Sequence, residues 1–328
     1  MKHVLIIRLS ALGDVALMVP LVHDYASANP DIRFTVAGPP LLQPLFEGEH
    51  NVSYLGLKKK QSFIKIYKVL NAVGADTVVD LHKVNRVGFA LTLLRLRHLF
   101  NFHFRLCSLR KGKFSRWLYL HHLYHHPRKP QFQRYDEVFQ RAGLSKVDKL
   151  NVDKLISSHD NVSIHQPCIG IAPFSQHKGK IWPWENVETL VALLARHGLY
   201  ILLFGSKEEA PQLEALAGQH TTVTSLAGKQ SFKEELEIIK GLTLMVSMDS
   251  ANMHFASVLG IPVVSIWGAT HPDFGFYPQQ QNRANALCAN LPCQPCSAFG
   301  QKACKYGDYR CLSAITPEMV FERIQQII

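Results

Sequence analysis

The chain has 328 residues, of which 47% are hydrophobic and 19% are charged, so it can bury the cores of two domains and is not an intrinsically disordered protein. Charged residues interrupt every apolar stretch of about 18 residues, so no membrane-spanning helix is expected. The formal net charge is +11, and this excess favours an anionic partner such as a nucleotide, a phosphorylated glycolipid, a membrane surface or a nucleic acid.

The first expected elements are a buried strand over Val4–Leu9 and a helix over Val15–Ala28. The N-terminal sequence has some likeness to a secretory signal peptide, but Arg8 and Asp14 interrupt its apolar run and no small-residue cleavage site follows cleanly. The sequence therefore predicts a cytoplasmic protein. In that compartment its seven cysteines are expected to be reduced or metal-bound instead of paired.

Short apolar runs continue to alternate with helical patterns along the first half of the chain. An alternation of this kind predicts a parallel sheet with helices on both faces. The remaining expected elements of this half are strands at Arg33–Ala37, Val52–Leu57, Thr77–Leu81 and Phe100–Leu106, and helices at Gln61–Val73, Arg86–Leu96 and Tyr135–Gly143.

The same alternation begins again in the second half of the chain. The polar stretch Ser145–Gln166 separates the halves, so the sequence predicts two doubly wound α/β domains, residues 1–155 and 156–328, with the last helix packing back on the first domain. Ligands of such domains bind beyond the carboxyl ends of the strands. The expected strands are Cys168–Pro173, Tyr200–Phe204, Val223–Leu226, Leu244–Met248 and Val263–Trp267, and the expected helices are Trp184–Arg196, Lys207–Ala217, Phe232–Lys240, Asn252–Leu259 and Pro317–Ile328.

The turn after the first strand reads Ser10-Ala11-Leu12-Gly13-Asp14. Gly13 permits a tight turn, and Asp14 then lies at the start of the helix. A carboxylate there can take a proton from a sugar hydroxyl, and the free N–H groups of a helix start can hold an anion. The alternative is structural, because the helix dipole stabilises an acidic residue at this position. The turn is neither a G-x-G-x-x-G fingerprint nor a G-x-x-x-x-G-K-[ST] phosphate loop.

A second candidate loop follows the strand at Cys168–Pro173. It places Ser175, Lys178 and Lys180 within reach of a phosphate at the end of the strand. A lysine there offsets the charge that builds up on a departing diphosphate. The alternative is a solvated basic loop in which the two tryptophans that follow anchor the packing.

The most specific segment is Met245–Ala256, where a strand leads to Asp249-Ser250-Ala251 and then to a helix that carries His254. Small residues let a ligand approach the backbone, and the helix N-terminus offers N–H donors to phosphate oxygens. A neighbouring strand ends in the small-residue loop Gly268–Pro272. Taken alone, Asp249 and Ser250 are also explained by helix capping, and His254 by a histidine of the core.

Together these segments resemble glycosyltransferase family 9, the heptosyltransferases of lipopolysaccharide core assembly. The resemblance rests on motifs that occur in the family's order and cover nearly the whole chain. They are R-L-S-A-L-G-D at Arg8–Asp14, K-I-W-P at Lys180–Pro183, D-S-A-N-M-H-F-A at Asp249–Ala256, G-A-T-H-P at Gly268–Pro272, and the cysteine-containing tail that ends at Cys311–Glu318.

The resemblance implies a GT-B architecture, in which two Rossmann-like domains face each other across a cleft. It also implies an inverting transferase that moves a heptose from a nucleotide diphosphate sugar, expected to be ADP-heptose, to a lipopolysaccharide core or lipid A-type acceptor. Asp14 is the implied general base, and Lys180 is the implied stabiliser of the leaving nucleotide. The expected donor-binding residues are Ser175, Lys178, Asp249, Ser250, Ala251 and His254.

The chain departs from many family members at Ser250-Ala251, where they have Thr-Gly. Ala251 would be restricted if the site required a positive φ at this position. The basic loop before Lys180 is also individual to this chain. A family 9 transferase with a different donor sugar or acceptor is therefore the nearest alternative.

The expected acceptor-binding residues lie mainly in a basic part of the first half, where Lys and Arg suit the carboxylates and phosphates of an anionic glycolipid. They are Gly13, Lys60, Arg86, Lys113 and Arg134. Interleaved aromatics, Phe114, Trp117 and Tyr119 among them, predict peripheral contact with the inner membrane surface. For most of these side chains, an ordinary solvated face with aromatic packing is the alternative.

Four cysteines near the C-terminus, Cys293, Cys296, Cys304 and Cys311, could offer thiolates to a structural zinc ion. Their spacing is irregular for a zinc ribbon. Reduced thiols that pack a loop, or disulfides formed after oxidation, are the alternatives. The implied sugar transfer needs no cofactor, so such a zinc ion would be structural.

Two further classes of function stay open as alternatives. The missing glycine fingerprint counts against an oxidoreductase on two Rossmann domains, and a nicotinamide-binding assay would test it. A charge-driven nucleic-acid or membrane-binding protein would show salt-dependent DNA affinity and no turnover of a nucleotide sugar. The preferred reading has a nucleotide sugar and an anionic glycolipid as partners, and no nucleic acid.

Overall fold

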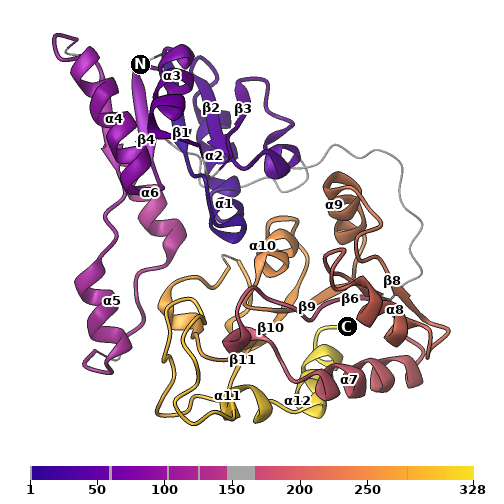
Figure 1. The fold of residues 1–328 in the computed structure, drawn as a ribbon. Helices are drawn as coiled ribbons and strands as arrows, with labels where there is room; N and C mark the ends of the chain where they lie inside the picture. The colour runs from indigo at the N-terminus through magenta and orange to yellow at the C-terminus, as the bar shows by residue number, and fades with distance from the viewer. Residues whose placement is uncertain (1, 59–60, 102, 125, 146–166, 279) are drawn as a thin grey trace. The chain divides into compact units, whose positions relative to one another are not determined.

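The computed structural model describes residues 2–58, 61–101, 103–124, 126–145, 167–278 and 280–328, and Figure 1 shows its ribbon. These residues form two compact units. The first consists of residues 2–111 and 131–145, and the second of residues 112–130 and 167–328. The expected boundary between residues 155 and 156 lies outside the described residues. Residues 112–130 were expected in the first domain and are grouped with the second unit instead.

The first unit contains a parallel five-stranded sheet in the order β3-β2-β1-β4-β5. Its central strand is buried, because Val4 pairs with Phe34 on one side and with Thr77 on the other. The strands are β1 (His3–Ile7), β2 (Arg33–Gly38), β3 (Val52–Gly56), β4 (Thr77–Asp80) and β5 (Arg105–Ser108), and the helices are α1 (Leu12–Ala16), α2 (Val19–Ala28), η1 (Pro40–Phe46), α3 (Phe63–Val73), α4 (Asn85–Arg97) and α6 (Gln131–Arg141).

The expected helix over Val15–Ala28 is two helices, because α1 ends at Ala16 and α2 begins at Val19. Pro20 explains the break. A proline has no backbone N–H, and its ring conflicts with the carbonyl of the residue four positions earlier, which here is Ala16. The short α1 is thereby separated from the long helix, and Asp14 lies within it.

The second unit contains a parallel six-stranded sheet in the order β11-β10-β9-β6-β7-β8. The strands are β6 (Cys168–Ala172), β7 (Tyr200–Leu203), β8 (Val223–Ser225), β9 (Leu244–Met248), β10 (Val263–Trp267) and β11 (Ala286–Cys288). The helices are α5 (Lys113–Leu120), α7 (Trp184–Arg196), α8 (Ala210–Ala217), α9 (Phe232–Lys240), α10 (Ala251–Val258), α11 (Arg310–Ser313) and α12 (Pro317–Gln325). The prediction of two α/β units built on parallel sheets is confirmed.

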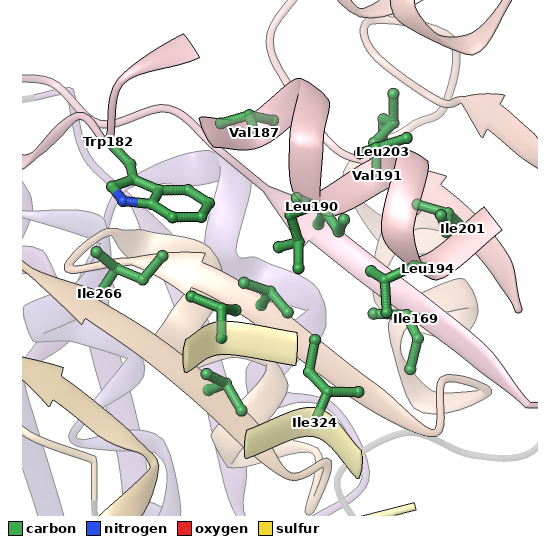
Figure 2. Close-up of a cluster of buried hydrophobic side chains, with 14 of the residues drawn as sticks. Ile169, Trp182, Val187, Leu190, Val191, Leu194, Ile201, Leu203, Ile266 and Ile324 are labelled. Atoms are coloured by element: carbon green, nitrogen blue, oxygen red, sulfur yellow. The ribbon is translucent and has the colours of Figure 1, made fainter. Parts of the chain in front are cut away.

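Helix α12 packs against α7 in the core of the second unit (Figure 2). Ile324 of α12 and Leu190 of α7 are fully buried with Ile169 of β6 and Ile266 of β10. Burying one such side chain contributes about 1.5–3 kcal/mol. The last helix therefore belongs to the core of the second unit, and its expected packing on the first domain stays a prediction.

None of the described helices combines the length and the continuous hydropathy that a bilayer-crossing segment requires.

Candidate active site

Asp14 of α1 lies close to three polar groups of the first unit. Its Oδ2 is 2.5 Å from Nη2 of Arg8 and accepts a hydrogen bond from the Ala11 N–H at 3.3 Å. Its Oδ1 accepts a hydrogen bond from the phenol of Tyr135 at 3.4 Å. The carboxylate is thus held by a cation, a backbone donor and a phenol just after the carboxyl end of β1. The hydrogen bond from Ala11 also agrees with the alternative in which Asp14 only stabilises the start of the helix.

Arg8 connects the ends of two neighbouring strands. Its Nη1 donates to the carbonyl of Leu81, which follows β4, while Nη2 contacts Asp14. Burial lowers the pKa of Arg8, but the charge of Asp14 and the hydrogen bond to it outweigh burial, so that the pKa is raised. The guanidinium is therefore a permanent positive charge beside the carboxylate.

Tyr135 reaches Asp14 from α6, which is anchored on α2. The rings of Phe139 and Tyr25 stack at 4.6 Å, and the Tyr25 hydroxyl donates to Asp136 at 2.7 Å. Complete burial, and then the charge of Asp14, raise the pKa of Tyr135 far above neutrality. The phenol consequently keeps its proton and acts as a donor to the carboxylate.

The end of β4 adds a second buried carboxylate to this edge of the first sheet. Oδ1 of Asp80 accepts from the backbone N–H groups of His82 and Lys83, at 3.0 and 2.9 Å. Burial raises the pKa of Asp80, and these N–H groups, followed by the charge of Arg8, act in the opposite direction. Asp80 therefore shapes the loop whose Leu81 carbonyl holds Arg8.

In the second unit, Lys180 and Asp249 form a largely buried ion pair. Nζ of Lys180 is 2.8 Å from Oδ2 of Asp249, and the Thr270 hydroxyl donates to the same oxygen at 2.7 Å. The backbone carbonyl of Asp249 accepts from Lys180 at 3.2 Å and from the Ser175 hydroxyl at 3.3 Å. Residues that follow β6, β9 and β10 thus converge at one edge of the sheet, as expected for parallel strands.

Glycines hold the loops of this site close together. The Ala269 N–H donates to the Gly179 carbonyl at 2.7 Å, and a Cβ added at Gly179 would lie 2.8 Å from the Gly300 carbonyl. Gly300 has φ of +81°, and a Cβ there would lie 2.7 Å from Cγ of Lys180. The backbone of Gly300 therefore packs directly on the lysine side chain, and only glycine fits without strain.

The N-terminus of α10 follows Asp249 directly. Ser250 is the extended N-cap residue, but its hydroxyl contacts the Ser247 hydroxyl at 3.0 Å and does not cap the helix. Among the described residues, no side chain caps this helix start, so its N–H groups are suited to phosphate oxygens. Ala251 is the first helical residue and does not have a positive φ, so alanine is accommodated there without strain.

The structure brings together only some of the predicted donor residues. Ser175, Lys180 and Asp249 meet, and Ser250 and Ala251 follow them at the start of α10. Lys178 does not join them, because it is exposed and its ammonium lies 5.4 Å from the ring centroid of Tyr309. His254 is buried within α10.

The predicted acceptor residues are more dispersed. Gly13 lies in α1 beside Asp14, and Arg134 precedes Tyr135 on α6, where it donates to Gln131 and to the Arg110 carbonyl. Lys60 lies outside the described residues. Arg86 is exposed at the start of α4 in the first unit. Lys113 is exposed on α5 of the second unit, which does not match the first-domain position on which its prediction rested.

The predicted zinc ligands are all free cysteines. Cys311 is buried in the core of the second unit, and Sγ of Cys296 lies 3.8 Å from the Ala269 carbonyl. Within the described ranges, no set of three or more His, Cys, Asp or Glu side chains is arranged to hold a metal ion. The structural zinc ion stays a prediction, and no catalytic step depends on it.

Sequence reasoning did not select three residues that the structure places at these sites, namely Arg8, Thr270 and Tyr135. Arg8 and Thr270 lie inside motifs that were recognised, so their position after a strand was an available signal. Tyr135 lies 121 residues from Asp14 in the chain, and only the packing of α6 on α2 brings it there.

Two α/β units with parallel sheets, each with polar residues just after the carboxyl ends of its strands, are the arrangement found in the GT-B class of glycosyltransferases. Residues 66–307 match the sequence profile of glycosyltransferase family 9 (heptosyltransferase), and the chain belongs to this family.

Curated relatives match different shares of the chain. Lipooligosaccharide heptosyltransferase 2 of Haemophilus influenzae is 27% identical over 50% of the chain and 48% of that protein, so the matched region spans about half of this relative. Lipopolysaccharide heptosyltransferase 1 of Escherichia coli K12 is 25% identical over 88% of the chain and 95% of that protein.

The fold is also found among solved structures. The structure of E. coli heptosyltransferase WaaC with ADP-2-deoxy-2-fluoro heptose superposes with a TM-score of 0.69 at 19% identity, covering 99% of both chains.

Proposed function

We propose that this protein is an inverting heptosyltransferase that moves a heptose from ADP-heptose to an anionic acceptor of the lipopolysaccharide core or lipid A type. The observation that carries the proposal is the Asp14 carboxylate, held by Arg8 and Tyr135 after the first strand of a family 9 chain. The ligand in the WaaC structure, a fluorinated ADP-heptose, supports ADP-heptose as the donor. The acceptor places the reaction at the inner face of the cytoplasmic membrane.

In the proposed reaction, Asp14 removes the proton of the acceptor hydroxyl while the oxygen attacks the anomeric carbon of the heptose. The new bond forms on the face opposite the diphosphate, and the bond from the anomeric carbon to the phosphate oxygen breaks with its electron pair leaving on ADP. The Arg8 guanidinium, 2.5 Å from Oδ2 of Asp14, holds the carboxylate in place after the first strand. A base placed in this way contributes a rate factor of about 10²–10⁴.

The leaving diphosphate is assigned to Lys180 and the start of α10. Lys180 offsets the Asp249 charge in the described structure, so an arriving diphosphate meets a site whose carboxylate is already neutralised. The uncapped N–H groups at Ser250 and Ala251 then donate to phosphate oxygens, and Asp249 accepts from donor hydroxyls. Because this chain supplies positive charge at each of these points, the proposed mechanism assigns no step to a metal ion.

The direct test is to incubate the protein with ADP-heptose and a defined deacylated core acceptor. We expect release of ADP together with a product that is heavier by one heptose, measured by mass spectrometry. Repeating the assay with other nucleotide sugars tests the alternative of a family 9 transferase with a different donor sugar. The Ser250-Ala251 departure from many family members is the reason to test it. ADP-heptose left unchanged while another donor is consumed would establish that alternative.

The Asp14→Asn substitution tests the assigned base. It keeps the size and the hydrogen-bonding oxygen of the side chain but removes its basicity, so we expect kcat to fall at least about 100-fold while the Kd for the donor stays nearly unchanged. Asp31→Asn changes an exposed carboxylate of the same unit and serves as the matched control. Normal turnover by Asp14→Asn would show that Asp14 is not the base.

A further inference from the structure

Helix α4 exposes apolar side chains on the face that is turned away from its core. Val87, Leu91 and Leu94 are buried, whereas Phe89 is 63% exposed and Leu96 is 59% exposed. Leu93 is also exposed, and the spacing of residues 89, 93 and 96 places them along one stripe of the helix. A surface helix of a water-soluble domain normally carries polar residues on this face.

The stripe continues onto the start of α3, which packs against α4 (Figure 1). Phe63 and Ile64 are exposed there, and the ring of Phe63 lies 6.1 Å from that of Phe89. Beyond the C-terminus of α4, Phe100 is almost fully exposed. We call this surface the α3–α4 apolar face, and its residues are Phe63, Ile64, Phe89, Leu93, Leu96 and Phe100. Exposed apolar side chains that gather on neighbouring helices in this way are typical of an interaction site.

Basic residues surround the α3–α4 apolar face. Arg86, Arg95 and Arg97 are exposed on α4, and Lys65 and Lys68 are exposed on α3. Within the described part of the chain, none of these five side chains forms an ion pair or a side-chain hydrogen bond. Asp76 and Asp80 are the only acidic residues of the sequence between Glu49 and Asp136. The surface therefore combines exposed apolar side chains with five basic residues, in a part of the sequence that has only two acidic residues.

We propose that the α3–α4 apolar face docks on a bilayer of anionic phospholipid. Aromatic and aliphatic side chains insert at the level of the headgroups, and Lys and Arg contact the lipid phosphates. A protein partner without acidic residues would leave these five basic side chains without counter-charges, whereas an anionic lipid surface matches both the apolar side chains and the positive charge around them. The proposal extends the proposed function, because a lipid-anchored acceptor is presented at such a surface, and it assigns membrane contact to α3 and α4 and not to α5.

The test is co-sedimentation of the full chain with vesicles, without any sugar substrate. We expect binding to vesicles of phosphatidylcholine with phosphatidylglycerol, and binding that weakens with added salt and on vesicles of pure phosphatidylcholine. The double substitution Phe89→Glu and Leu96→Glu removes apolar area and adds repulsive charge, so we expect the partition coefficient to fall about tenfold or more. Both positions are exposed, and circular dichroism checks that the variant is folded.

Two control variants make the assignment specific. Met319→Glu alters an exposed apolar residue of α12 and should leave vesicle binding unchanged. Phe114→Glu with Trp117→Glu alters the exposed aromatics of α5. The proposal is overturned if the wild type does not bind anionic vesicles, or if the α5 variant loses binding while the α4 variant keeps it. It is also overturned if the wild type is a dimer that the α4 variant converts to monomers with unchanged vesicle binding.

Failure of this proposal and failure of the transferase assignment give different results. If both are correct, the α4 variant turns over a water-soluble deacylated acceptor normally and loses activity only on acceptor embedded in anionic vesicles. Vesicle binding without any turnover would overturn the transferase assignment alone.

Discussion

Each candidate site is organised by one carboxylate and one cation. Arg8 with Asp14 and Lys180 with Asp249 are both largely buried, and in each pair further donors, Tyr135 or Thr270, contact the same carboxylate. A buried charge is tolerated only when it is paired and hydrogen-bonded. Each pair therefore holds together two side chains to which the proposed mechanism assigns a role.

Replacing Lys180 by methionine should weaken ADP binding by at least about tenfold, which corresponds to about 1.4 kcal/mol. The substitution removes the cation near the proposed diphosphate and leaves Asp249 as a repulsive charge. Lys178→Met is the matched control, because Lys178 precedes Lys180 by two residues but directs its ammonium to Tyr309. Titration calorimetry measures both, and an equal loss in the two variants would contradict the separate placement of these lysines.

Asp80→Asn should make the free energy of unfolding less sensitive to pH. Burial raises the pKa of Asp80 above its ordinary value of 3.8, so the folded state binds the proton more tightly than the unfolded state. The stability that this group contributes is thus complete at low pH and is lost as pH rises through its folded pKa.

The asparagine keeps an oxygen for the His82 and Lys83 N–H groups and has no charge to bury. We therefore expect the variant to gain stability relative to the wild type as pH rises above about 4, measured by urea unfolding from pH 4 to 7. A difference between the two proteins that stays constant with pH would show that Asp80 does not titrate in this way.

At the scale of elements, two loops that meet at glycines determine where Lys180 lies. Gly179 and Gly300 bring the loops after β6 and before α11 into backbone contact, and the lysine stem lies against Gly300. The position of a cation thus depends on residues that carry no charge.

Gly300→Ala should lower stability by about 1–3 kcal/mol and also weaken ADP binding. The added Cβ is strained at a φ of +81° and meets the Lys180 side chain. Gly307→Ala provides the control, because Gly307 has a φ of +79° but a Cβ there meets no atom within 4 Å. Thermal unfolding and ADP titration separate strain, shared by both variants, from displacement of the lysine, expected only for Gly300→Ala.

The sequence predicted elements best where an apolar run ended at clear turn or capping residues. The observed bounds of β9, β10, α7 and α9 are the predicted ones, and Ser231 and Glu234 form a capping box at the start of α9. The strand expected at Phe100–Leu106 begins only at Arg105, because Phe100 is solvent-exposed and apolarity alone did not reveal this. Helix α5 and strand β11 were not predicted, since both are short and depend on tertiary packing for stability.

The candidate site was predictable to the extent that it lies in local motifs. Asp14, Lys180 and Asp249 each follow a strand, and the parallel topology brings the last two together. Lys178 resembles Lys180 in sequence terms, and only the direction of its side chain distinguishes them. The contact of Tyr135 with Asp14 depends on helix packing, which a single sequence does not specify.

At the scale of the whole molecule, each unit has its own apolar core. The core of the first unit includes Leu5, Ile7 and Val78, and that of the second unites β6, α7 and α12. The charge of the chain is also unevenly distributed, because the sequence from His50 to Tyr135 is strongly basic.

Ile324→Ala should destabilise the second unit by about 2–5 kcal/mol, because it leaves a cavity between α12, α7 and the sheet. We expect faster hydrogen exchange in peptides of β6, β9 and β10, measured by mass spectrometry. Met319→Ala changes an exposed residue of the same helix and should have little effect. Unchanged exchange in Ile324→Ala would contradict the role of α12 in this core.

The indole of Trp182 donates to the carbonyl of Ile315 at 2.9 Å, and this bond is buried. Trp182 follows Lys180 by two residues. This hydrogen bond therefore links the loop that contains Lys180 to the segment that leads into α12. A chain cut after Ala314 would lose this attachment together with the helix. The proposed nucleotide site would then be loosened by a deletion that removes none of the residues assigned to touch the nucleotide.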